Sequence, residues 1–158
     1  MYDTSDFNNV CYLYLLGIIL SNGLTSPLFN ELRAKLQAVY GVTAGFKTIS
    51  NNQSLFVFAT TTNKNKCDQV TNKLIEIKSN LKKYITKSMF KYNLDCIKYV
   101  HQQMDILNYD YIDDLFDPKF QFIKQNIQSI QYLDFIDKCQ QLMDIKFVLD
   151  IDEGNYEN

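Results

Sequence analysis

The nearly unbroken apolar run Val10–Leu20 constrains the fold more than any other feature of the sequence. A helix needs about 20 apolar residues to span a bilayer, so this run is too short for a membrane segment. Its residues are good helix formers, and Asn22-Gly23 follows as a left-handed stop, which predicts a helix over Val10–Ser21. A helix that is apolar on every side must be buried on most sides. We therefore expect other elements to pack around it in layers.

The next segments predict a second helix and then a hairpin. Ser26-Pro27 is typical of an N-cap followed by proline at the first helical position, which predicts a short helix over Pro27–Gln37. Period-two alternation predicts a strand over Tyr40–Ile49. A polar turn leads to a second strand, Ser54–Thr61, rich in β-branched and aromatic residues. On the first strand, one side is expected to carry Tyr40, Val42, Ala44 and Phe46.

Helical periodicity dominates the rest of the chain. We expect amphipathic helices over Asn63–Lys83 and Thr86–Asn108, two shorter helices near 119–127 and 131–143, and a final strand over Ile145–Ile151. The apolar positions expected to be buried on the first two are Val70, Leu74, Ile77, Leu81, Phe90, Leu94, Ile97 and Met104.

This order of elements predicts an α+β fold, with a mostly antiparallel sheet covered on one face by helices. We expect a single domain over residues 1–151 and a frayed acidic tail over residues 152–158.

Charge and cysteine usage exclude several kinds of partner. The formal net charge of −2 gives no basic surface for nucleic acid, and no segment predicts a membrane partner. The four cysteines are widely scattered and the chain begins with a polar, acidic stretch that is unlike a secretory signal. We therefore expect reduced thiols and an intracellular, cytoplasmic protein.

The sequence contains few groups that could perform catalysis. His101 is the only histidine, and Met104 and Asp105 stand where an H-x-x-E-H motif needs glutamate and histidine. Zinc needs three or four convergent ligands, so we expect His101 to be a surface or partly packed residue and the chain to hold no metal. Cys96 lies off the helical face of His101, which argues against a cysteine nucleophile. Asp113-Asp114 is interpreted as a solvated loop.

One stretch resembles a known family. Ser26-Pro27-Leu28-Phe29 continues to Leu32-Arg33, and Tyr40 follows seven residues after the arginine. This resembles the pattern S-[SP]-x-L-[FY]-x-x-L-R, with tyrosine at plus seven, of the pitrilysin, insulysin and mitochondrial processing peptidase family, the inverted zincins of peptidase family M16. Further segments resemble the family at residues 55–61, 66–83, 85–90 and 125–143, so the resemblance covers about residues 10–150.

The resemblance implies a role in peptide cleavage. In this family two similar halves close around a peptide, and one half holds zinc and a general base. The other half contributes an arginine and a tyrosine, which implies that Arg33 holds a substrate carbonyl. Tyr40 would donate a hydrogen bond to the oxyanion formed when zinc-bound water attacks. The chain would then not be catalytic alone, and the zinc would be bound by a partner chain or domain carrying H-x-x-E-H. The strand Val42–Phe46 could also pair with an extended substrate through its edge.

Two departures from the family pattern lead to further expectations. The glycine-rich turn is reduced to Ser21-Asn22-Gly23, and only nine residues precede Val10, so we expect the family's first strand to be missing. An incomplete half-unit would have an open sheet edge. The apolar helix Val10–Ser21 would also lack part of its cover, which would expose Leu13, Leu16 or Leu20. The chain would then self-associate, unless Ile145–Ile151 closes the edge.

Two alternatives stay open beside the substrate-binding half. A family member can lose its peptidase role and serve as a structural or scaffold subunit. The chain can also be a protein-interaction module whose similarity to the family is accidental. The pair Arg33 and Tyr40 favours the substrate-binding half over the structural subunit, because a retired subunit has no need to keep both residues.

Overall fold

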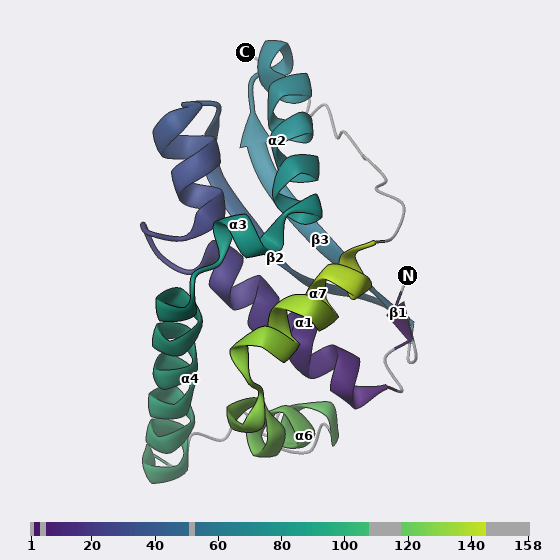
Figure 1. Cartoon of the computed structure of the whole chain (residues 1–158), viewed down its shortest axis with the longest axis vertical. Helices are drawn as coiled ribbons and strands as arrows, with labels where there is room; N and C mark the ends of the chain where they lie inside the picture. Colours follow the sequence, from purple (N-terminus) through teal and green to yellow (C-terminus); the bar gives the residue numbers. More distant parts are fainter. Residues whose placement is uncertain (1, 4–5, 51–52, 108–117, 145–158) are drawn as a thin grey trace.

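The computed structural model describes residues 2–3, 6–50, 53–107 and 118–144. The elements are β1 (Tyr2–Asp3), α1 (Phe7–Ser21), the π-helix η1 (Phe29–Lys35), β2 (Val39–Ser50), β3 (Gln53–Thr62), the short 3₁₀ helix η2 (Lys64–Lys66), α2 (Cys67–Ser79), α3 (Leu81–Tyr84), α4 (Lys87–Leu107), α6 (Pro118–Asn126), η3 (Ile127–Ser129) and α7 (Tyr132–Met143). The strand order is β1-β3-β2 with antiparallel pairing, and Figure 1 shows the sheet behind α2 and α3. This is the predicted α+β fold.

The hairpin of β2 and β3 forms as predicted, with pairing from Val39↔Thr62 to Ser50↔Gln53. Its two faces differ in burial. Val42, Ala44, Phe56 and Phe58 pack against the hydrophobic core on the helical side. The opposite face carries the exposed residues Thr43, Ala59 and Thr61.

Helix α1 is the centre of the core, as its apolar sequence predicts. It contacts β2, α4, α6, η3 and α7, and so has neighbours on most sides. The prediction that Leu13, Leu16 or Leu20 would be exposed is wrong, because all three are 0% exposed. The surrounding helices supply the cover that we expected to be missing.

Helix α1 begins earlier than the apolar run. The Asp6 side chain caps it by accepting hydrogen bonds from the backbone N–H groups of Asn8 and Asn9, at 3.1 and 3.3 Å. The helix ends as predicted, with Gly23 in the left-handed conformation at φ 79°.

A short strand precedes α1, so the prediction that the first strand is missing is wrong. Tyr2 and Asp3 pair with Ser54 and Gln53 of β3. The polar and acidic segment at the beginning of the chain lacks the alternating apolar pattern that predicts a strand. It pairs only through the backbone groups at the end of the β2–β3 hairpin. Among the described residues, β1 covers only this end of β3, and β2 has no strand partner on its outer side.

The predicted helix Asn63–Lys83 is interrupted at Asn80, whose φ and ψ of −138° and 50° are not helical. Gln140 of α7 caps both sides of the break. Its side-chain carbonyl accepts from the Leu81 N–H at 3.1 Å, and its amide donates to the Lys78 carbonyl at 3.1 Å. The four apolar positions predicted for this segment, Val70, Leu74, Ile77 and Leu81, are all buried.

The later helices agree with their predicted positions. On α4, Phe90, Leu94 and Ile97 are buried as expected. Several predictions lie outside the described part of the chain: the side chains of Phe46 and Met104, the loop with Asp113-Asp114, the strand Ile145–Ile151 and the tail 152–158. Over the described residues, no helix is both long and apolar enough to cross a membrane.

Candidate functional site

Arg33 lies on the exposed side of η1, while its neighbour Leu32 is fully buried. The guanidinium carbon sits 5.2 Å from the centre of the Phe29 ring, one helical turn earlier. A cation–π contact at an exposed site is worth about 0.5–1 kcal/mol, enough to favour one orientation of a long side chain. The charged group is thus held at the surface over the Phe29 ring.

The connection from η1 to β2 has a fixed shape. Gln37 has a left-handed backbone with φ 49°, a conformation that costs a non-glycine residue about 1–3 kcal/mol. Hydrogen bonds on both sides hold it. The Ala38 N–H donates to the Leu32 carbonyl at 2.9 Å, and the Lys66 ammonium donates to the Gln37 carbonyl at 2.8 Å. This turn sets the direction in which the chain enters β2.

Tyr40 is turned out of the core by an irregularity in the strand. The register between β2 and β3 shifts between Val39 and Gly41, so Val39 is 7% exposed and Tyr40 is 72% exposed. The prediction that Tyr40 shares a side with Val42 and Ala44 is therefore wrong. A bulge adds one residue to a strand and redirects the side chain there.

Two threonines of β3 fix the backbone around the bulge. The Thr60 hydroxyl donates to the Gly41 carbonyl at 2.7 Å, and the Thr62 hydroxyl donates to the Ala38 carbonyl. Tyr40 thus projects from a backbone held on both sides. Within the described residues, its phenol makes no hydrogen bond and Arg33 makes no ion pair, so their donor groups are available to a ligand.

The pair offers two different kinds of donor on adjoining elements. A guanidinium is always charged and presents a planar fork of N–H groups. A phenol donates one hydrogen bond without carrying charge at neutral pH. Arg33 is also the only arginine among the 16 basic residues of the chain, the others being lysines.

His101 does not form a metal site. It is only 8% exposed, so it is more buried than the surface or partly packed position we predicted. Across the described ranges, no cluster of three or more His, Cys, Asp or Glu residues could hold a metal ion. The part of the chain that the structure describes therefore offers no ligand set for a zinc ion.

Two of the four cysteines lie in environments that disfavour a nucleophilic role. All four are unpaired, and Cys11 and Cys139 are buried in the core. Burial raises the pKa of the Cys11 thiol to about 11 and also raises the pKa of Cys139. The reactive form of cysteine is the thiolate, which these environments disfavour.

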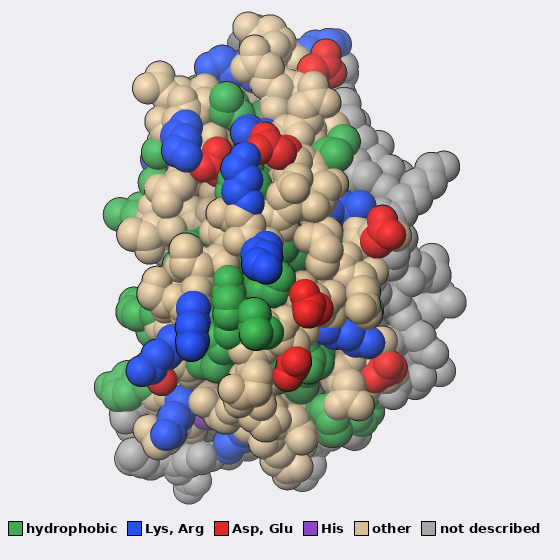
Figure 2. Space-filling view, in the orientation of Figure 1, with side chains coloured by type: hydrophobic (Ala, Val, Ile, Leu, Met, Phe, Trp, Pro, Cys, Tyr) green, Lys and Arg blue, Asp and Glu red, His purple; other side chains and the backbone are tan. Residues whose placement is uncertain are grey.

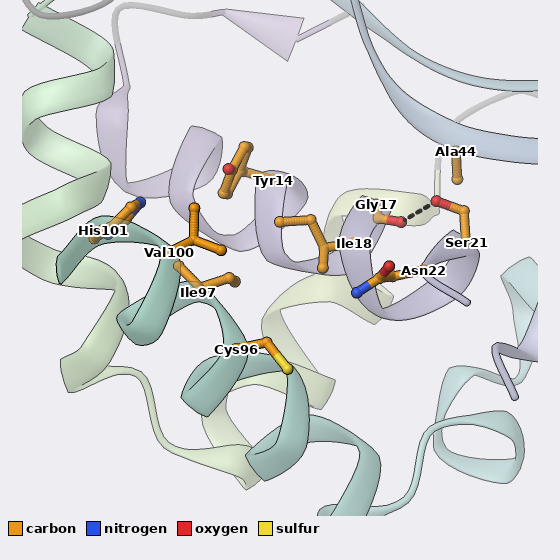
Figure 3. Close-up of a pocket in the computed structure, with 10 residues that line it drawn as sticks. All are labelled: Tyr14, Gly17, Ile18, Ser21, Asn22, Ala44, Cys96, Ile97, Val100 and His101. Carbon is orange, nitrogen blue, oxygen red and sulfur yellow. Dashed lines mark hydrogen bonds between the residues drawn. The ribbon is translucent and has the colours of Figure 1, made fainter. Parts of the chain in front are cut away.

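A pocket of about 410 Å³ lies between α1, α4 and β2, and the sequence did not indicate it (Figure 3). Its lining residues are Tyr14, Gly17, Ile18, Ser21, Asn22, Ala44, Cys96, Ile97, Val100 and His101. Helical spacing indicates which residues share a face of α1 or of α4. The sequence does not show that these two faces lie opposite each other, because that depends on how the helices pack.

Comparison with known proteins identifies the family. Residues 3–94, more than half of the 158 residues, match the family described as the peptidase M16 inactive domain. The chain belongs to this family. No curated protein is similar enough to count as a match.

Solved structures share the fold. A conserved protein from Enterococcus faecalis V583 has 14% sequence identity and a TM-score of 0.62, over 90% of this chain and 34% of that one. A peptidase M16 inactive domain from Pseudomonas fluorescens has 19% identity and a TM-score of 0.62, over 89% of this chain and 34% of that one. The chain thus spans about a third of the length of these proteins, and at such identities the likeness concerns the fold alone.

Proposed function

We propose that the chain is the substrate-binding, non-catalytic half of a pitrilysin-family metallopeptidase. It would present Arg33 and Tyr40 to an active site whose zinc is held by another chain or domain. The observation that carries the proposal is the bulge that turns Tyr40 to solvent, while Arg33 is exposed on the preceding helix η1. The four cysteines form no disulfides, which supports an intracellular, cytoplasmic location for the proposed substrate binding.

The residue types suit the proposed roles. Arg33 would donate from its guanidinium fork to a backbone carbonyl of the bound peptide. Tyr40 would donate a hydrogen bond to the peptide oxygen that gains negative charge when zinc-bound water of the partner half attacks the peptide. When the two halves close, water leaves the site, and both hydrogen bonds become stronger in the lower local dielectric.

The first experiment identifies the partner. The tagged full chain is used to capture proteins from its native source, and the captured chains are searched for H-x-x-E-H. Because a scaffold subunit could also bind such a chain, capture alone does not distinguish a substrate-binding half from a scaffold. Measuring peptide turnover by the reconstituted complex distinguishes them.

Variants of the pair test their roles in that complex. Tyr40→Phe removes only the hydroxyl, and we expect kcat to fall roughly 10- to 1000-fold, as for other oxyanion donors. Arg33→Lys keeps the charge but loses the fork, so it should also reduce kcat/KM, and Arg33→Ala should reduce it further. All three should assemble and unfold near the wild-type temperature, because both side chains are exposed.

Tyr92→Phe and Lys82→Ala serve as matched controls, since they alter an exposed tyrosine on α4 and an exposed cation on α3. Full kcat in the complexes carrying Tyr40→Phe and Arg33→Ala would show that the proposed roles are wrong and would favour a scaffold.

A further inference from the structure

We propose that Lys66 is a positioning residue, which fixes the direction in which Tyr40 projects relative to Arg33 and does not itself touch substrate. The inference rests on the proposed function and adds to it a residue from a third element, η2, which lies outside the family-like string of residues 26–40.

The segment that joins Arg33 to Tyr40 determines how these two side chains lie relative to each other. It contains the end of η1, the left-handed residue Gln37 at φ 49° and the first residues of β2. A left-handed backbone is unfavourable for a residue with a side chain and persists only where the surroundings hold it. Relaxation at Gln37 would reorient the start of β2, which carries Tyr40.

Lys66 holds Gln37 from a distant part of the chain. Its ammonium donates to the Gln37 carbonyl at 2.8 Å, across 29 residues of sequence. A hydrogen bond from a charged donor is stronger than one between neutral groups. Other lysines, such as Lys35 and Lys73, pair with carboxylates, whereas Lys66 binds a backbone carbonyl. Its charge therefore acts on the shape of the turn.

The backbone that carries Lys66 is itself held in place. Its N–H donates to the Asn63 carbonyl at 2.9 Å, and α2 begins at the next residue, Cys67. Buried Val70 and Leu74 attach that helix to the core. The ammonium thus acts from a fixed base and connects the start of α2 to the turn between η1 and β2.

The neighbouring contacts hold Ala38 and leave Gln37 to Lys66. The Ala38 N–H donates to the Leu32 carbonyl at 2.9 Å, and the Ala38 carbonyl accepts from the Thr62 hydroxyl. Because Ala38 keeps both partners when the ammonium is removed, the hairpin should still form. The loss should be confined to the direction in which the chain enters β2.

The first test observes Tyr40 in the free full-length chain. The protein is labelled with 3-fluorotyrosine, and the fluorine NMR signal of Tyr40 is identified by its loss in Tyr40→Phe. Lys66→Met keeps the aliphatic stem and removes the donor, so the Tyr40 signal should shift by more than its linewidth. Lys66→Arg keeps a charged donor and should leave the signal in place. Lys82→Met, which alters an exposed lysine of α3, is the matched control.

A second background separates the turn from a general loss of folding. Asparagine adopts the left-handed conformation more readily than glutamine does. When Gln37→Asn is present, Lys66→Met should therefore shift the Tyr40 signal less than half as far. Circular dichroism checks that each variant is folded.

The second test measures turnover by the reconstituted complex. Lys66→Met should lower kcat at least fivefold and leave KM within twofold, because Tyr40 acts on an oxyanion that forms only in the transition state. Lys66→Arg should restore most of kcat. A contribution to stability alone would produce neither this split between kcat and KM nor this rescue.

The inference is overturned if the Tyr40 signal does not move in folded Lys66→Met, if Lys66→Arg or Lys82→Met moves it as far, or if Gln37→Asn does not reduce the shift. Full kcat for Lys66→Met in a complex that Tyr40→Phe impairs would also overturn it. Full kcat for Tyr40→Phe itself would instead overturn the proposed function, and this inference with it, even where the fluorine signal moves.

Discussion

The carboxylate of Glu76 is held by donors from two helices. Lys73 on α2 pairs with one oxygen, and Lys83 and Tyr84 on α3 donate to the other, Lys83 at 2.7 Å. These hydrogen bonds, that of Lys73 first, lower the pKa of Glu76 from its ordinary 4.5 to about 2. The side chain is 35% exposed, so water screens these contacts. The cluster still bridges the break at Asn80.

We predict that Glu76→Gln reduces the acid sensitivity of the fold. Because folding lowers this pKa, the contacts stabilise the protein fully above about pH 4.5 and are lost as the pH falls toward about 2. Tm measured by circular dichroism should therefore fall less steeply over this range in the variant. Asp68→Asn, at the other end of α2, is the control. An unchanged slope for Glu76→Gln would show that these hydrogen bonds do not contribute.

The candidate residues were predictable from the sequence, but their setting was not. The spacing of Arg33 and Tyr40 within a family-like string identified both residues. The bulge that exposes Tyr40 arises from the pairing of β2 with β3. The threonine hydroxyls that hold it, those of Thr60 and Thr62, lie 19 and 24 residues along the chain from the carbonyls they bind. Alternation along one strand gives no information about such contacts, so it assigned Tyr40 to the wrong side.

At the scale of elements, Gly17 determines how closely α1 approaches the sheet. We predict that Gly17→Ala destabilises the protein by about 1–3 kcal/mol, because the new Cβ would meet the Ala44 carbonyl oxygen at 3.0 Å. Helix propensity alone would favour alanine, so destabilisation would be due to the contact. Denaturant unfolding measures the change.

Gly41→Ala is the matched control for this prediction. A Cβ at Gly41 meets nothing within 4 Å, and its φ is not positive, so the variant should unfold close to wild type. If Gly17→Ala is as stable as Gly41→Ala, α1 can move away from β2 without cost.

Elements with strong local signals were predicted well, and those that depend on distant residues were not. The hairpin and the buried stripe of α2 follow from periodicity and polar turns. The break at Asn80 depends on Gln140 of α7, which the sequence places far away. Strand β1 likewise forms only because the end of β3 is available for pairing.

At the scale of the whole molecule, the face drawn in Figure 2 has no concentrated basic patch. Figure 2 shows basic and acidic side chains interspersed over the helical face, in keeping with a net charge of −2. A nucleic-acid surface would instead concentrate lysine and arginine.

We predict that the pure chain binds no stoichiometric zinc and cleaves no peptide. Zinc sites need three or four ligands, and the only histidine, His101, is buried on α4 without a metal-binding cluster among the described residues. Elemental analysis after gel filtration checks the metal content. About one zinc per chain, or chelator-sensitive cleavage that follows the chain through purification, would contradict the prediction.

The outer edge of β3 is paired with another strand only at one end among the described residues. β1 pairs only with Ser54 and Gln53, so among the described residues the edge over 55–62 has no strand partner. This segment is rich in aromatic and β-branched residues, the composition that favours pairing between chains. We predict that the chain self-associates through this edge, and light scattering over a concentration series should show a rising average mass.

Two lysine substitutions test which strand is used, because Ala59 of β3 and Thr43 of β2 are directly paired and exposed on the same face. Lysine on a strand disfavours pairing of its edge with another strand. Ala59→Lys should therefore shift the chain toward monomer, while Thr43→Lys should leave association nearly unchanged. The reverse result would place the contact on β2. A wild-type chain that stays monomeric at high concentration would contradict the prediction and favour closure of the edge from within, with Ile145–Ile151 as the candidate strand.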